Sequence, residues 1–340
     1  MPTDPPLAAA IDPPLTPAQR LALARRAFGP AAQVIDAIPV GGGTVNEVWR
    51  LRIVGDGIAA AILRVAPSPR IAAGGPSWMT AEGLRREQAA IALLPHLSSI
   101  LPRTVCFDGS REIIDRDWVV QSLVPGAPWS EVDSMLDDGQ RIGLWRQMGA
   151  ICRAIHEVRG TAFGPAHAPL FATWADLVLD DARGLLEDAE RFGVDTEPFI
   201  RLAASVEANR AVLDRVDSPR LIHSDLGPRH CFVASDADGQ WQIIGLIDLE
   251  FARFADPRSE SAIELFDRMP PDDRFHEAFS EGYGPFVTPP GAEVRAVLYG
   301  AIALGWAATD MARLGAREGL ADVIGQMTTW LERIPRSSIR

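Results

Sequence analysis

Lysine is absent from the 340-residue chain, so all 33 basic residues are arginines. Any role that a lysine commonly fills must therefore fall to another side chain. Acidic residues outnumber basic ones by 45 to 33, which gives a formal net charge of −12. Extended contact with nucleic acid needs a basic stripe, so this charge balance argues against a nucleic-acid partner.

Cysteine and long apolar runs are also scarce. The three cysteines, Cys106, Cys152 and Cys231, are too scattered for a disulfide framework or a zinc site, and we expect them to be small buried hydrophobic residues. The longest apolar run, residues 296–308, is shorter than the roughly 18 residues of a membrane span. The first residues, MPTDPPLAAAIDPP, lack the basic region and apolar core of a secretion signal. These absences favour a soluble, cytoplasmic protein without a membrane partner.

The most informative stretch is residues 221–252, LIHSDLGPRHCFVASDADGQWQIIGLIDLEFA. Two β-rich runs joined by an Asp-Gly turn predict a hairpin, and polar residues fall at its ends, where loops often carry chemistry. The order is His223, Asp225, then His230 five residues later, the hairpin and finally Asp248. This is the layout of a phosphotransfer catalytic loop, in which one Asp orients the acceptor hydroxyl and a second binds Mg²⁺.

These motifs resemble those of the aminoglycoside phosphotransferase and choline kinase-like family. HSDLGPRH, IDLEFA and ADPRSE stand where the family has HGDLxxxN, IDWxxA and GDPxxD. The resemblance covers about residues 34–262 and implies an α+β, two-lobed, protein-kinase-like fold. We expect a tail and short helix over 1–30, an N-lobe of antiparallel sheet plus one helix over 31–125, and a mainly helical C-lobe over 126–340.

The resemblance also implies roles for the residues of this stretch. Asp225 would orient the acceptor hydroxyl and receive its proton. Asp248 would bind Mg²⁺, with Mn²⁺ as the other candidate. His230 replaces the family's Asn, so it either ligates the metal directly or hydrogen-bonds a metal-bound water or a phosphate oxygen.

Three further residues of these motifs have supporting or open roles. His223 is expected to support the loop rather than react. Asp256 is expected either to hydrogen-bond the catalytic loop or to cap a helix. Glu260 stands where the family has an Asp.

The nucleotide-binding candidates lie in the N-terminal third of the chain. Residues 34–67 predict three antiparallel strands, and the Gly-rich turn between the first two can lie over phosphates because its backbone N–H groups are accessible. The resemblance extends to this hairpin and to the segment WVVQSLVPG, whose backbone would bind the base of ATP or GTP. The candidates are Gly42, Gly43, Thr44 and Asn46 in the hairpin and Ser122 and Val124 in the second segment.

Arg64 stands on the predicted third strand, where kinases carry a nucleotide-binding lysine. In the helical stretch TAEGLRREQAAIALLPHL, a turn of about 100° per residue puts Glu87 on the same face as Leu84, Ile91 and Leu94. A buried acid is costly unless it is paired, so we predict an ion pair between Arg64 and Glu87. The alternatives are a partly solvated Glu87 and an Arg64 on the solvent face of its strand.

Protein-kinase activity is disfavoured because the chain has no Asp-Phe-Gly or Ala-Pro-Glu motif and only a short connection after Asp248. The resemblance instead implies transfer of a γ-phosphate to a hydroxyl group of a small molecule. Family acceptors include aminoglycoside, hygromycin-type and macrolide antibiotics, choline, methylthioribose and homoserine. An acidic C-lobe cluster could bind a polyamine, although acidic solvated helix faces are commoner. Its members are Glu264, Asp267, Asp272, Asp273, Glu277 and Glu281.

Two other classes of function stay open. The replaced Lys and Asn are compatible with a nucleotide-binding pseudokinase without catalysis. A metallohydrolase could use the four polar residues at the ends of the hairpin, but the remaining histidines have no ligand spacing. The sequence does not indicate an oligomeric state.

Overall fold

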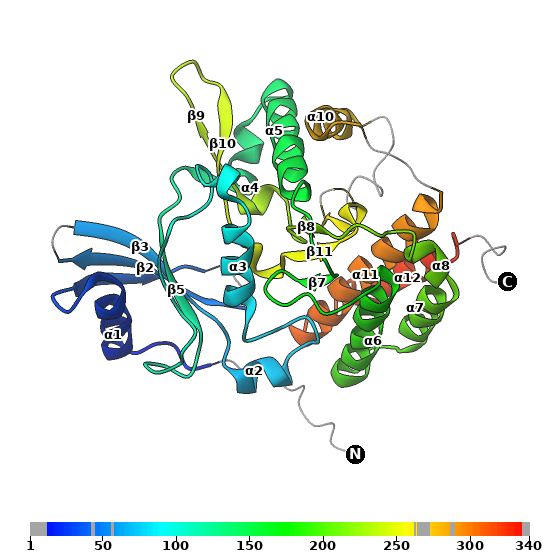
Figure 1. Cartoon of the computed structure of the whole chain (residues 1–340), viewed down its shortest axis with the longest axis horizontal. Coiled ribbons are helices and arrows are strands. Elements are labelled where there is room, and N and C mark those ends of the chain that lie inside the picture. The colour runs from blue at the N-terminus through cyan, green and yellow to red at the C-terminus, as the bar shows by residue number, and fades with distance from the viewer. Residues whose placement is uncertain are drawn as a thin grey trace.

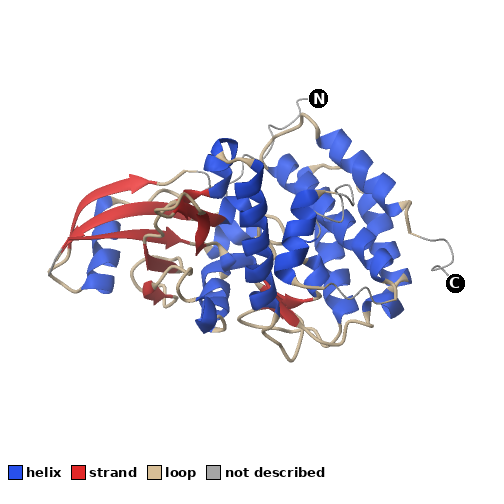
Figure 2. Cartoon of the chain, turned by 90° about the horizontal axis from the view of Figure 1, so that it is seen from above, coloured by secondary structure: helices blue, strands red, loops and turns tan. Residues whose placement is uncertain are grey.

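A computed structural model of the chain describes residues 12–41, 45–55, 58–261, 263, 273–285 and 290–334. Over these residues a sheet-containing lobe is followed by a larger, mainly helical lobe, as the sequence predicts (Figure 1). Seen from above, the long strands gather at one end of the molecule and helices fill the other (Figure 2). No helix in the described part of the chain is both long and apolar enough to cross a membrane.

The N-lobe is built on a five-stranded antiparallel sheet with the order β1-β2-β3-β5-β4. The predicted three-stranded meander is confirmed as its first part. Helix α1 (Pro17–Phe28) starts at a capping box made by Thr16 and Gln19, and it buries Leu23 against the sheet residues Leu51 and Leu63. The strands are β1 (Gln33–Pro39), β2 (Glu47–Val54), β3 (Ile58–Val65), β4 (Thr104–Asp108) and β5 (Trp118–Ser122).

Helix α3 (Gly83–Ala92) lies on the side of the sheet that faces the C-lobe (Figure 1). Its Leu84 and Glu87 are buried, as the helical periodicity predicts. A short helix, α2 (Pro69–Gly74), precedes α3 in the chain. Ser68 caps this helix and a proline opens it, so the start signal was present in the sequence.

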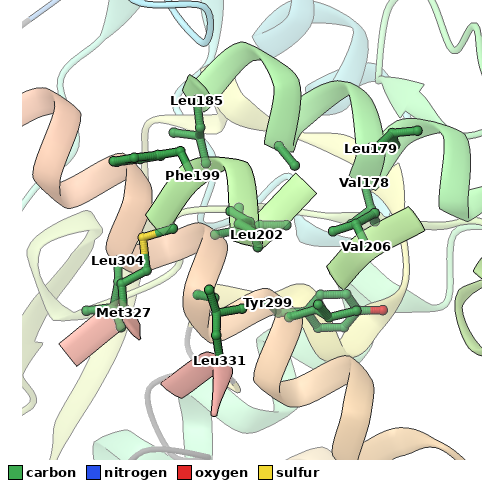
Figure 3. Close-up of a cluster of buried hydrophobic side chains, with 14 of the residues drawn as sticks. Val178, Leu179, Leu185, Phe199, Leu202, Val206, Tyr299, Leu304, Met327 and Leu331 are labelled. Atoms are coloured by element: carbon green, nitrogen blue, oxygen red, sulfur yellow. The ribbon is translucent and has the colours of Figure 1, made fainter. Parts of the chain in front are cut away.

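The C-lobe is mainly helical, and its core forms where α6, α7, α11 and α12 meet. Figure 3 shows Leu185, Phe199, Met327 and Leu331 converging there. Apolar residues of α5, among them Leu144 and Met148, are buried and pack against the hairpin of residues 231–246. The helices are α4 (Trp129–Val132), α5 (Asp138–His156), α6 (Trp174–Phe192), α7 (Glu197–Ala208), α8 (Arg210–Leu213), α10 (Arg274–Tyr283), α11 (Ala292–Arg313) and α12 (Leu320–Leu331).

Two small sheets position the polar loops of the C-lobe. One contains the predicted hairpin, β9 (Cys231–Ser235) with β10 (Trp241–Leu246), joined by β6 (Ala127–Pro128). The other has the order β7-β11-β8, with β7 (Gly164–Pro165), β11 (Arg253–Ala255) and β8 (Arg220–Ile222). His223 directly follows β8 and Asp248 follows β10, so both candidates lie at strand ends. Short 3₁₀ turns are η1 (Pro95–Leu97), η2 (Asp133–Met135), η3 (Pro228–His230), η4 (Leu249–Phe251) and η5 (Pro257–Ser259).

The three cysteines are free thiols. Cys152 and Cys231 are fully buried, as expected of small hydrophobic residues, whereas Cys106 is half-buried at the sheet.

Candidate active site

Arg64 connects the two lobes. Its strand neighbours Leu63 and Val65 pack into the core of the sheet, so Arg64 projects from the opposite face toward α3. Its Nη1 donates to Glu87 Oε2 at 2.5 Å, and its Nη2 donates to Asp248 Oδ1 at 2.6 Å. The predicted Arg64–Glu87 ion pair is thus present, and the solvent-facing alternative is wrong. The same guanidinium also holds an acid of the C-lobe.

The other oxygen of Glu87 is also used. Glu87 Oε1 accepts a hydrogen bond from Gln121 Nε2 of β5 at 2.8 Å, and only 1% of Glu87 is exposed. Each oxygen of this buried carboxylate therefore has a partner, which is what burial of a charge requires. On the N-lobe side, Gln121 thus fixes Glu87, and Glu87 fixes the guanidinium of Arg64.

Asp248 occupies a left-handed backbone conformation, with φ 71° and ψ 47°. Ser224 in the loop after β8 has the same φ, and such strain at non-glycine residues is concentrated at functional sites. Burial would raise the pKa of the Asp248 carboxyl, but the adjacent Arg64 cation outweighs it and lowers this pKa below its usual value. Asp248 is therefore a carboxylate at neutral pH.

His223 braces the loop that carries Asp225. Its Nε2 donates to the carbonyl oxygen of Ile247 at 3.0 Å, and its Nδ1 accepts from the backbone N–H of Asp225 at 3.3 Å. The side chain is fully buried. It thus ties the Asp225 loop to the residue that precedes Asp248, in agreement with the expected supporting role.

Glu260 anchors the same loop through two hydrogen bonds to its backbone. Its two oxygens accept from the backbone N–H groups of His223, at 2.7 Å, and Leu226, at 3.4 Å. Burial would raise the pKa of Glu260, but a hydrogen bond and charge from His156 outweigh it and hold this pKa at about 2. The loop is therefore held by a carboxylate that is ionised at neutral pH.

Of the two roles expected for Asp256, a hydrogen bond to the catalytic loop or a helix cap, the structure shows the cap. It caps η5 by accepting from Arg258 N at 3.1 Å. Its carboxylate also pairs with Arg295 at 3.0 Å and accepts from the Tyr299 hydroxyl at 2.7 Å. The contacts to the loop are made by Glu260 instead.

His230 lies between the two aspartates. Its Nδ1 donates to the backbone carbonyl of Asp225 at 2.6 Å, which leaves Nε2 as the unprotonated nitrogen of the neutral ring. That nitrogen is 3.5 Å from Asp248 Oδ2, the oxygen that Arg64 does not occupy. Burial lowers the pKa of His230, so the neutral form dominates at physiological pH. One nitrogen and one carboxylate oxygen can thus share a divalent cation, a donor set that suits Mn²⁺ as well as Mg²⁺.

Asp225 has a partner that the sequence analysis missed. Arg229 Nη2 contacts both carboxylate oxygens of Asp225, at 2.6 and 2.7 Å. The Arg229 side chain is 66% exposed and that of Asp225 is 28% exposed. Because exposed ion pairs contribute at most about 1 kcal/mol, Arg229 can release Asp225 at little cost.

Glu250 is the second residue that the sequence analysis missed. It follows Asp248 by two residues, is only 5% exposed, and accepts a hydrogen bond from the side-chain amide of Asn46. Burial and the Asp248 charge raise the pKa of Glu250 to about 8. Asn46, predicted to bind nucleotide, thus directs its amide N–H to the C-lobe and ties the first hairpin to the Asp248 loop.

The remaining nucleotide-binding candidates are tested only in part by the structure. Gly42, Gly43 and Thr44 lie outside the described residues. Ser122 Oγ accepts from Arg103 N at 3.0 Å, so its side chain holds the segment that leads into β4. The backbone of Val124 makes no hydrogen bond with the described part of the chain, which leaves it free for a base.

The acidic cluster does not form a ligand site in the described residues. Glu264, Asp267 and Asp272 lie outside them. Asp273 caps α10 by accepting from Phe275 N at 2.7 Å, and Glu281 pairs with Arg146 of α5 at 2.6 Å. These two acids hold α10 and its contact with α5, and Glu277 lies exposed in the first turn of α10. The described part of the cluster therefore gives no argument for a polyamine acceptor.

Comparisons with known proteins agree with this geometry. The sequence model described as "Phosphotransferase enzyme family" matches residues 36–296. No curated protein sequence matches the chain.

Several solved structures have the same fold. The GDP and kanamycin complex of APH(2")-IIIa has a TM-score of 0.60 at 18% identity, with 92% of this chain and 96% of that chain covered. A thermostable variant of aminoglycoside phosphotransferase APH(4)-Ia with AMP-PNP and hygromycin B has a TM-score of 0.60 at 16% identity, covering 92% and 97%. The gentamicin complex of APH(2")-IIa has a TM-score of 0.61 at 13% identity, covering 96% and 99%. At these identities the likeness establishes the fold.

Proposed function

Because the chain belongs to the phosphotransferase enzyme family, we propose that it transfers the γ-phosphate of ATP or GTP to a hydroxyl group of a small molecule. The observation that carries this proposal is the bridge made by Arg64. One guanidinium contacts Glu87 of the N-lobe helix at 2.5 Å and Asp248 of the C-lobe at 2.6 Å. A strand cation, a helix glutamate and a metal-binding aspartate form the core of a phosphotransfer site.

Each residue then has a defined task. Arg64 holds nucleotide phosphates and Glu87 fixes its guanidinium. Asp248 and His230 hold Mg²⁺ or Mn²⁺, which when bound neutralises charge on the transferred phosphoryl group. Asp225 orients the acceptor hydroxyl and takes its proton, and Arg229 leaves the Asp225 carboxylate as the hydroxyl arrives. Ser122 to Val124 present backbone groups to the base.

The proposed acceptor is a sugar-bearing natural product of the aminoglycoside or hygromycin type. Solved structures with this fold contain kanamycin, gentamicin and hygromycin B, which supports testing these compounds first. A screen of nucleotide consumption should include them together with a macrolide, choline and homoserine. We expect turnover with at least one sugar-bearing compound and none with choline. Turnover of choline alone would contradict the proposed acceptor class. If no compound in a broad panel supported nucleotide consumption, the proposed function would be contradicted.

His230→Asn tests the proposed metal site. If the imidazole nitrogen ligates the metal, the wild-type protein should be at least as active with Mn²⁺ as with Mg²⁺. The variant replaces nitrogen by an amide oxygen, so the ratio of Mn²⁺-supported to Mg²⁺-supported kcat should fall. His96→Asn is the control, because His96 is not one of the candidate site residues and its ring contacts the carbonyl oxygen of Ala154 at 3.2 Å. An unchanged ratio in His230→Asn would leave Asp248 as the metal ligand and remove His230 from that role.

A further inference from the structure

A pocket with a volume of about 550 Å³ lies in the C-lobe. This volume is within the usual range for small-molecule sites, and neither Arg64, Asp225 nor Asp248 lines the pocket. Its described lining holds only two acids, Glu157 and Asp256. Five arginines also line it: Arg153, Arg159, Arg220, Arg258 and Arg295. In a chain of net charge −12, this is a marked local excess of positive charge.

Both lining acids are already paired. Asp256 contacts Arg295 at 3.0 Å, and Glu157 contacts Arg153 at 3.3 Å. Within each pair the two charges neutralise each other, so neither acid is left to balance the charge of Arg159 or Arg220. Any anion held by the pocket would therefore interact with cations that the protein itself leaves uncompensated.

Arg159 and Arg220 are the uncompensated cations. Within the described residues, Arg159 makes no ion pair or side-chain hydrogen bond, and Arg220 donates only to the carbonyl oxygen of His156 at 3.4 Å. The two residues face each other across an antiparallel β-bridge, and like charges directly opposite destabilise such a pair. Burial, and next the charge of Arg159, lower the pKa of the Arg220 guanidinium. A bound anion would relieve this repulsion.

We propose that this pocket binds a phosphate group, either as inorganic phosphate or as the phosphate end of a small metabolite. Guanidinium groups present N–H donors in a planar fork that matches phosphate oxygens, and two facing arginines can hold one such group. The concave shape and the unbalanced cations favour a small multivalent anion over an extended acidic partner.

The pocket is separated from the candidate active site by buried side chains. His156 lines the pocket, and its Nε2 is 3.5 Å from the Glu260 carboxylate. Glu260 in turn holds the backbone of His223 at 2.7 Å. A phosphate bound in the pocket therefore lies behind the Asp225 loop and does not compete with nucleotide.

The test is calorimetric titration of inorganic phosphate, and separately of phenyl phosphate, at constant ionic strength so that screening does not change. The double variant Arg159→Gln/Arg220→Gln should bind at least about ten-fold more weakly than the wild type, because charge-assisted hydrogen bonds are lost. The control Arg50→Gln/Arg52→Gln removes the same charge from exposed positions of β2 and should bind like the wild type. Tighter binding of phenyl phosphate than of inorganic phosphate would identify an organic phosphate as the ligand.

Thermal unfolding gives an independent readout. Phosphate should raise the Tm of the wild type and of the control but not that of the double variant. Without phosphate, the double variant should be at least as stable as the wild type, because the repulsion between Arg159 and Arg220 is removed. The single variant Arg159→Gln, which breaks no described side-chain contact, should also lose affinity.

Two outcomes would overturn the proposal: no phosphate binding by the wild type, or equal binding by the wild type and the double variant. The latter would place the phosphate elsewhere. Because neither nucleotide nor acceptor is present, these outcomes do not depend on whether the protein is a phosphotransferase.

Discussion

Asp225→Asn is expected to lower kcat by at least about 100-fold and to leave the fold intact, because an amide cannot accept the proton of the acceptor hydroxyl. The substitution changes no backbone contact of the loop. His223 and His230 bind the main chain of Asp225, at 3.3 and 2.6 Å, and Glu260 holds the flanking N–H groups. Within the part of the chain that the structure describes, the side-chain hydrogen bonds at risk are those to the exposed Arg229. Steady-state kinetics and thermal unfolding of the same preparation measure both effects.

The matched control is Asp217→Asn, a carboxylate-to-amide change at an exposed position between α8 and β8. It should leave kcat and Tm unchanged. A well-folded Asp225→Asn protein with near-wild-type kcat would remove Asp225 from the reaction, and with it the assignment of the loop as catalytic.

Glu87→Ala should lower the free energy of unfolding by about 3–5 kcal/mol, the usual cost of removing one partner of a buried ion pair. Glu87 is 1% exposed and Arg64 is 9% exposed, so water cannot replace the lost carboxylate easily. Among the described residues, the acids that still contact Arg64 would then be Asp248 and Glu250 of the C-lobe. A guanidinium held there competes with a metal for Asp248, so the KM for the nucleotide and the metal requirement should both rise.

Urea unfolding and steady-state kinetics at several metal concentrations measure these effects. Glu112→Ala, an exposed glutamate of the N-lobe, is the control and should change neither quantity. Arg64→Lys should retain more activity than Arg64→Ala because a cation remains between the acids. Wild-type stability and KM in Glu87→Ala would show that the pair neither stabilises the N-lobe nor positions Arg64.

The parts of the site that the sequence predicted correctly are those governed by a local repeat. Helical periodicity placed Glu87 on a buried face, where an acid needs a cation, and the resemblance to kinases supplied Arg64, at the position of their nucleotide-binding lysine, as that cation. The Asp-Gly turn between two β-rich runs predicted the β9–β10 hairpin, which sets Asp248 at a strand end. The burial of Glu87 and the β9–β10 hairpin each follow from a local pattern, whereas the pairing of Glu87 with Arg64, 23 residues away, required the resemblance as well.

The missed features depend on contacts between distant segments. Glu250 occupies a variable position of the motif IDLEFA, so the sequence assigns it no role. In the fold it accepts a hydrogen bond from Asn46, 204 residues away in sequence. Likewise, Asp256 and Glu260 are only four residues apart, and their sequence does not say which one reaches the loop. The phosphate pocket draws its arginines from α5, β8, η5 and α11 and the segments next to them, so no short motif marks it.

The most direct test of the proposed function follows the γ-phosphate itself. With γ-labelled ATP or GTP, Mg²⁺ or Mn²⁺ and a panel of hydroxyl-bearing acceptors, ³¹P NMR or mass spectrometry identifies the product that receives the label. We predict that the wild-type protein forms a phosphate monoester on an acceptor hydroxyl and that Asp225→Asn does not. A protein that binds nucleotide but leaves the label on it, or releases it only as inorganic phosphate, would contradict the account.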